Sequence, residues 1–150
     1  MINRYELFSS SVACLYRYVQ KIERTEMAKY GLKGPHAQCL LTISHYPQGI
    51  TASQICEICD KDKAAISRTL AELEEAGMIT RTLGEGKRYR VGLQLTEQGQ
   101  EIAERVKTLA ALAVEQAGSG LADENRAVFY ASLNLIAENL RRISREGIAK

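Results

Sequence analysis

Hydrophobic residues recur at steps of three and four positions near both ends of the chain, a spacing that places them along one face of an α-helix. The pattern predicts one helix over about residues 5–30, a second that begins at Thr96 and breaks at Gly118, and a third that begins at Asp123. The apolar positions that define these helices are Phe8, Val12, Leu15, Val19, Ile22, Ile102, Val106, Leu109, Ala113, Phe129, Leu133, Ile136, Leu140 and Ile143. These stripes are long for a chain of 150 residues. An intramolecular bundle could bury them, but packing against a second copy of the chain is the favoured interpretation.

The middle of the chain predicts three shorter helices joined by tight turns. The first is an apolar helix over residues 35–46, and the second begins at Thr51, a good N-cap residue. A polar turn follows, in which either Asp60 or Asp62 caps the third helix, and this helix ends at Gly77. The result is a helix, a four-residue turn and another helix.

After this unit the hydrophobic period shortens from about 3.6 residues to about 2, which indicates strands. One short strand is expected over residues 78–83 and another over residues 89–95. Residues 84–88, Gly-Glu-Gly-Lys-Arg, form the tip of the hairpin between them. We therefore expect one domain with a helix-turn-helix and a β-hairpin at its centre.

Composition limits the possible classes of protein. Hydrophobic residues make up 45% of the chain and charged residues 25%, which is typical of a globular domain and argues against disorder. The 20 basic and 18 acidic residues leave a net charge of only +2, so any nucleic-acid site must come from local clustering. Such a cluster lies in residues 81–90, where one acid, Glu85, accompanies four cations, namely Arg81, Lys87, Arg88 and Arg90.

Neither secretion nor membrane insertion is expected. No apolar stretch approaches the roughly 18 residues that a membrane-spanning helix needs, and the first residues do not resemble a signal peptide. The four cysteines are therefore expected to be free thiols of a cytoplasmic protein rather than a disulfide framework. They are Cys14, Cys39, Cys56 and Cys59.

The third central helix presents a surface suited to a major groove. If Ile66, Leu70 and Leu73 face the core, the opposite face shows small residues and cations, namely Lys63, Ala64, Ser67, Arg68 and Ala71. Small residues permit close approach, and Ser67 and Arg68 can reach phosphate oxygens or base edges. The basic hairpin could enter the adjacent minor groove. The helix-turn-helix and this hairpin together form a winged helix-turn-helix.

Three segments of the chain resemble the MarR (multiple antibiotic resistance) family of bacterial transcriptional regulators. They are Thr51-Ala-Ser-Gln-Ile-Cys, the run over residues 62–81, and Leu95-Thr-Glu-Gln-Gly. The resemblance implies a mainly α fold with a small β-hairpin, in which a winged helix-turn-helix is flanked by long dimerisation helices. The DNA-binding lobe would cover about residues 35–96, and about residues 1–30 and 97–150 would form the dimer.

The same resemblance implies a homodimer that binds a pseudo-palindromic operator and is not an enzyme, typically a repressor that a small ligand or an oxidant releases. Ser67 and Arg68 match a Ser-Arg pair on the family's recognition helix, and Ser53 and Gln54 fall where the preceding helix touches the DNA backbone. One departure concerns the wing, where the family usually has an Asp-x-Arg element. The aligned positions hold Lys87 and Tyr89, or Gly86 and Arg88 after a one-residue shift, so the Asp is absent.

The remaining chemical groups indicate no metal site and no cofactor. Cys56 and Cys59 have the spacing of a redox or zinc pair, but they lie within a helix, lack a second pair and are expected to be buried. Cys14 and Cys39 are also expected in the core, although some relatives sense oxidants through a cysteine near Cys14. Surface exposure is expected for His36.

A weaker alternative places three residues in a cleft for a small aromatic or anionic effector, namely Arg17, Tyr18 and His36. Two other function classes remain as alternatives to a ligand-controlled DNA-binding regulator. One is a winged-helix module for protein contacts, which the basic hairpin disfavours because interface cores are depleted in charge. The other is a protein with thiol chemistry, either an enzyme at Cys56 and Cys59 or a redox-responsive regulator.

Overall fold

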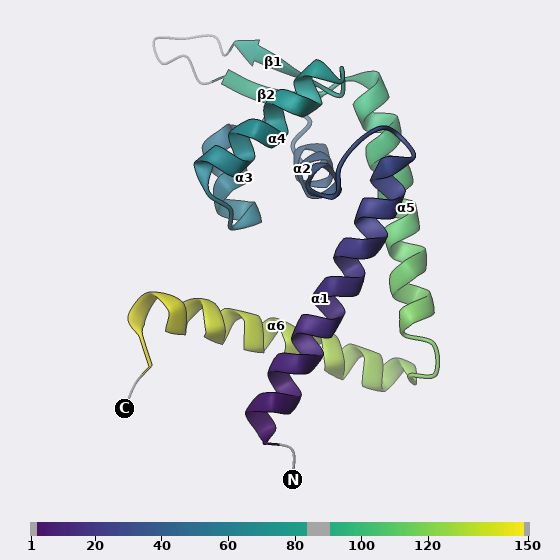
Figure 1. Cartoon of the computed structure of the whole chain (residues 1–150), viewed down its shortest axis with the longest axis vertical. Coiled ribbons are helices and arrows are strands. Elements are labelled where there is room, and N and C mark those ends of the chain that lie inside the picture. Colours follow the sequence, from purple (N-terminus) through teal and green to yellow (C-terminus); the bar gives the residue numbers. More distant parts are fainter. Residues whose placement is uncertain (1–2, 84–90, 149–150) are drawn as a thin grey trace. The chain divides into compact units, whose positions relative to one another are not determined.

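The computed structural model describes residues 3–148 except residues 84–90, and within this part of the chain it contains six helices and two strands (Figure 1). The fold is mainly α with a small antiparallel hairpin, as the sequence predicts. No described helix is long and apolar enough to span a membrane. The elements, in chain order, are α1 (Arg4–Ala28), α2 (Gly34–Ser44), α3 (Ala52–Cys59), α4 (Lys63–Glu75), β1 (Ile79–Leu83), β2 (Val91–Leu95), α5 (Glu97–Ala117) and α6 (Asp123–Glu146).

The chain divides into two compact units, Met1–Leu109 and Ala110–Lys150. The first unit contains the hydrophobic core, in which α2 packs against α1, α3, α4 and β2. Its largest fully buried side chains are Met27, Leu40, Ile43, Ile50, Ile55, Ile66, Leu70, Leu73 and Leu93. Burying one such side chain stabilises a fold by about 1.5–3 kcal/mol, so this cluster fixes α3, α4 and the hairpin as one body.

Polar caps define where the central helices begin and end. The Thr51 hydroxyl accepts a hydrogen bond from Gln54 N at 3.2 Å, and the Asp62 carboxylate accepts one from Ala65 N at 2.8 Å. Asp62 is therefore the N-cap of α4, which decides between the two predicted candidates, because Asp60 ends α3 in a left-handed conformation with φ 50°. Gly77 has φ +73°, a left-handed conformation that prevents the helix from continuing after α4, as its position predicts.

The hairpin is joined to the connection between α2 and α3 by a backbone bridge. β1 and β2 pair antiparallel with Ile79 opposite Leu95 and Arg81 opposite Leu93. A backbone bridge that the sequence pattern does not predict joins Ile50 to Leu93, with Ile50 N donating at 3.1 Å and Leu93 N at 2.8 Å. This bridge anchors the connection between α2 and α3 to β2.

Thr96 caps α5 as predicted and also joins it to the end of the helix-turn-helix. Its hydroxyl accepts a hydrogen bond from Gly99 N at 3.1 Å and donates one to the Gly77 carbonyl at 2.6 Å. A side chain at position 99 would collide with the Met78 carbonyl, so only glycine allows α5 to begin this close to the chain before β1.

The second unit consists of the end of α5, a turn and α6. Arg126 of α6 closes this turn, because its guanidinium donates to the Glu115 carboxylate at 2.7 Å and to the Gly118 carbonyl at 2.9 Å. Helix α6 begins at Asp123, as predicted, and carries two acids in its first turn, where they complement the helix dipole. None of the residues of α6 is buried, although its apolar stripe is regular.

Candidate nucleic-acid interface

The N-terminal half of α4 presents the surface that the sequence predicts. Ile66, Leu70 and Leu73 are buried, which confirms the predicted inward face. The opposite face is exposed and consists of Lys63, Ala64, Ser67, Arg68 and Ala71. Among the described residues, neither Lys63 nor Arg68 forms an ion pair. A convex helix face with small side chains and two cations can approach a polyanion closely.

The acids at the C-terminal end of α4 are largely engaged by other side chains. The Glu72 carboxylate contacts the Lys33 ammonium at 2.6 Å and the His36 ring at 2.8 Å. The Glu74 carboxylate contacts the Arg81 guanidinium at 2.8 Å. Arg81, a predicted DNA contact, therefore already has an anionic partner, and reaching a phosphate would require it to exchange or share Glu74.

The predicted backbone contacts on α3 lie at its exposed N-terminal end. Ser53 and Gln54 are both exposed. The Gln54 side chain also belongs to a capping box, because its carbonyl oxygen accepts a hydrogen bond from Thr51 N at 3.0 Å. Its amide N–H groups are still able to donate to an anion. Lys87, Arg88 and Arg90, the predicted wing contacts, lie outside the described residues.

His36 is buried, so the expectation that it is exposed is wrong. The residue is only 3% exposed because its ring occupies the space between the start of α2 and α4. Arg17 and Tyr18 are exposed on α1, and neither lines a described pocket that His36 lines. The structure therefore does not bring the three predicted effector residues together.

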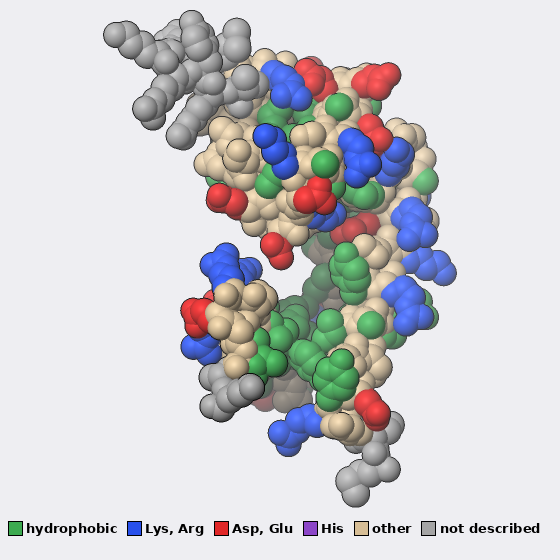
Figure 2. Space-filling model, turned by 60° about the vertical axis from the view of Figure 1, so that its left-hand side comes forward, with side chains coloured by type: hydrophobic (Ala, Val, Ile, Leu, Met, Phe, Trp, Pro, Cys, Tyr) green, Lys and Arg blue, Asp and Glu red, His purple; other side chains and the backbone are tan. Residues whose placement is uncertain are grey.

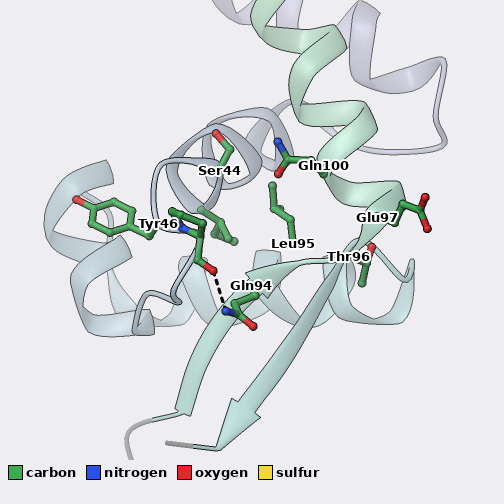
Figure 3. A pocket seen from close by; sticks show the side chains of 9 residues that line it. Ser44, Tyr46, Gln94, Leu95, Thr96, Glu97 and Gln100 are labelled. Atoms are coloured by element: carbon green, nitrogen blue, oxygen red, sulfur yellow. Dashed lines mark hydrogen bonds between the residues drawn. The ribbon is translucent and has the colours of Figure 1, made fainter.

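A cavity of about 300 Å³ lies where the end of α2, the end of β2 and the start of α5 meet (Figure 3). Ser44 and Gln100 supply neutral polar groups, and the Leu95 side chain points between them. Gln94 closes one side by donating a hydrogen bond to the Pro47 carbonyl at 2.8 Å. None of Arg17, Tyr18 and His36 lines this cavity.

The four cysteines are free, but they differ in burial. Cys39 and Cys59 are buried as expected, and Cys56 is half-buried against the same core. Burial raises the pKa of the Cys39 thiol to about 12, and the neighbouring Cys59 contributes. Cys14 is exposed, so its expected core position is wrong, because the apolar face of α1 beside it is uncovered in the single chain. The described residues contain no group of three His, Cys, Asp or Glu side chains arranged for a metal ion.

A helix-turn-helix followed by a hairpin and flanked by long helices defines the chain as a winged helix-turn-helix protein. Comparison with known proteins relates the central part of the chain to one family. A model of the MarR family matches residues 30–88, which cover α2, α3, α4 and β1. The resemblance noted in the sequence is thereby confirmed, and this segment of the chain is similar to the MarR family.

Solved structures of MarR proteins share the fold of nearly the whole chain. A MarR transcriptional regulator from Methanosarcina mazei Go1 has a TM-score of 0.81 at 24% identity, with 95% of this chain and 94% of that chain covered. A putative MarR family transcriptional regulator from Listeria monocytogenes, solved with a 26mer DNA, has a TM-score of 0.83 at 19% identity, with 100% and 99% covered. A MarR protein from Peptoclostridium difficile has a TM-score of 0.85 at 19% identity, with 95% and 94% covered.

Proposed function

We propose that the protein is a homodimeric transcriptional regulator that binds a pseudo-palindromic operator in double-stranded DNA. The observation that carries this proposal is the exposed N-terminal face of α4, where small residues and cations stand opposite the buried Ile66, Leu70 and Leu73. The DNA complex of the Listeria monocytogenes MarR structure supports it by analogy of fold. In this proposal residues 35–96 form the DNA-binding lobe, while residues 1–30 and 97–150 build the dimer.

Each predicted contact then has a distinct role. Helix α4 enters the major groove, with Ser67 and Arg68 toward base edges and with Ala64 allowing close approach. Lys63, Ser53 and Gln54 bind backbone phosphates, and so does Arg81 after it exchanges Glu74. Three cations of the hairpin act in the adjacent minor groove, namely Lys87, Arg88 and Arg90.

Exposed apolar side chains on the long helices support the dimer. Helix α1 buries only Met27 and α6 buries no residue, although both carry regular apolar stripes. Figure 2 shows hydrophobic side chains gathered in patches along the long helices, in contrast to the mixed charges over the part of the molecule that carries the hairpin. The exposed stripe of α6 consists of Phe129, Leu133, Ile136, Leu140 and Ile143. Apolar patches of this regularity mark interfaces in soluble proteins, and two copies of the chain would cover them.

Arg68→Ala is expected to weaken binding to the operator by about 1–3 kcal/mol, because it removes a cation and several donors from the face that meets DNA. The measurement is fluorescence anisotropy with a labelled duplex taken from the region upstream of the gene. Lys107→Ala is the matched control, since it removes the same charge from an exposed position on α5, outside the helix-turn-helix. Equal affinities of Arg68→Ala and wild type would remove α4 from the interface.

The finer part of the proposal is that the protein represses transcription until a small ligand or an oxidant releases it from DNA. The Cys14 thiol on α1 supports the oxidant, because it is exposed in the single chain whereas Cys39 and Cys59 are buried. Cavities in the first unit, such as the one lined by Ser44 and Gln100, support a small effector. Adding hydrogen peroxide or aromatic acids to the preformed DNA complex tests this part, and a complex that persists under both would contradict it.

A further inference from the structure

Glu72 on α4 is bound by two groups that lie 39 and 36 residues earlier in the chain. The Lys33 ammonium donates to one carboxylate oxygen at 2.6 Å, and the Nε2 atom of His36 lies 2.8 Å from the other. Lys33 is the N-cap residue of α2, and His36 lies in its first turn. We call these three residues the Glu72 cluster, and it connects the start of α2 directly to α4.

The hydrogen bonds of His36 fix both its proton and its orientation. Lys33 N donates to Nδ1 at 2.9 Å, so Nδ1 must carry a lone pair. The ring proton is therefore on Nε2, where it is donated to the Glu72 carboxylate. Both ring nitrogens are used, and a side chain that is only 4% exposed cannot exchange these partners for water. His36 is thus a rigid spacer between the N-cap of α2 and the C-terminal part of α4.

The carboxylate form of Glu72 is the form that these partners select. Hydrogen bonds from Lys33 and then from His36 hold the pKa of the Glu72 carboxyl below its ordinary value. The Glu72 side chain is 40% exposed, whereas the His36 side chain is buried. The directional and less screened contact of the cluster is therefore the one between Glu72 and His36.

This contact lies close to the residues that the proposed function places on DNA. Glu72 follows Arg68 by four positions, so at about 3.6 residues per turn it lies one turn further along nearly the same side of α4. The apolar contacts of Ile66, Leu70 and Leu73 hold α4 against the core, but such contacts are non-directional and tolerate small rotations. A directional hydrogen bond at Glu72 removes that freedom.

We propose that His36 and Glu72 are positioning residues for DNA binding, which fix the rotation of α4 so that Ser67 and Arg68 meet the groove in one geometry. The inference rests on the proposed function and adds to it that a buried residue outside the helix-turn-helix sets DNA affinity. Breaking the contact lowers the fraction of molecules in which α4 has the rotation that binds DNA. The apparent affinity for DNA falls by the same factor.

The sign of the effect of Glu72→Ala distinguishes positioning from simple electrostatics. Removing an acid from a helix that approaches phosphate should strengthen DNA binding if charge alone matters. If Glu72 positions α4, Glu72→Ala should instead weaken binding about tenfold, and His36→Leu should do the same. Because the two residues act through one contact, the double variant should lose about as much affinity as either single variant.

Anisotropy titrations with the operator duplex measure these affinities at a temperature where circular dichroism shows every variant fully folded. Under that condition a role in stability alone leaves the affinity unchanged. Glu75→Ala is the matched control, because it removes an equal charge from the same helix and Glu75 forms no hydrogen bond with the Glu72 cluster. This variant should bind as wild type or slightly more tightly. Glu72→Gln keeps an oxygen that accepts the hydrogen bond from His36, so it should lose less affinity for the duplex than Glu72→Ala. This variant provides the test if Glu72→Ala or His36→Leu does not fold.

Two negative results have different meanings. If wild type binds the duplex and both Glu72→Ala and His36→Leu bind it equally well or more tightly, the positioning role is overturned while the proposed function stands. If wild type binds no duplex DNA at low salt, the proposed function fails and the positioning role falls with it.

Discussion

Raising the salt concentration from about 50 to 200 mM is expected to weaken operator binding about 10³- to 10⁵-fold. The reason is counterion release, because each phosphate that a Lys or Arg side chain neutralises returns a condensed cation to the solvent. A dimer that presents Lys63, Arg68 and the hairpin cations twice would make roughly 6–10 such contacts. Anisotropy titrations at a series of salt concentrations give the slope of log affinity against log salt.

The slope also tests which side chains supply the contacts. Lys63 lies in the first turn of α4 and is exposed, so Lys63→Ala should lower the magnitude of the slope by about one unit for each phosphate that is no longer neutralised. Lys107→Ala on α5 should leave the slope unchanged. A wild-type affinity that falls less than about tenfold over the same salt range would contradict a phosphate-binding surface and would favour a protein partner instead.

Leu133→Glu is expected to convert the dimer into a monomer, with an increase of roughly 100-fold or more in the dimer dissociation constant. Leu133 lies in the middle of the exposed stripe of α6, which buries no residue in the single chain. A twofold interface would contain the substituted residue twice, so two carboxylates would lose water in an apolar contact. Sedimentation equilibrium at several concentrations measures the constant directly.

Asn134→Glu provides the matched control for this change. It adds the same charge to the adjacent position of α6, which lies off the apolar stripe by about 100° around the helix. The control variant should remain a dimer and should bind the operator as wild type does. Dimerisation of Leu133→Glu with wild-type affinity would show that the stripe of α6 is not the interface.

Most helix and strand positions could be predicted from the sequence because local signals specify them. The periodic apolar residues of α1, α5 and α6 and the caps Thr51, Asp62 and Thr96 agree with the observed elements. The inward face of α4 follows from periodicity as well. Such features depend on neighbours within one helical turn, and a single sequence contains that information.

Features that depend on distant partners could not be predicted in the same way. His36 is buried because Glu72, 36 residues later, lies opposite its ring, and no local pattern connects the two. The ion pair of Arg81 with Glu74 likewise arises from the turn of the chain between α4 and β1. In both cases tertiary contact determines whether a polar side chain is buried or available.

Cys14 illustrates a different limit. The sequence favours a core position because cysteine is among the residue types most often buried. Its neighbours Val12 and Leu15 also belong to the apolar stripe of this helix. In the single chain this part of α1 is exposed. An amphipathic stripe has the same periodicity whether it packs within the chain or against a second copy, so the sequence pattern does not determine which surface covers it.

The central claim is that two copies of α4 read the major grooves of one duplex, and methylation protection with dimethyl sulfate tests it most directly. The reagent attacks guanine N7, a major-groove acceptor that an Arg side chain contacts. Two clusters of protected guanines are expected about 10 base pairs apart on the bound duplex, and the protection of both should be weaker with Arg68→Ala. Binding that protects no guanine N7, or that leaves the same pattern in Arg68→Ala, would contradict it.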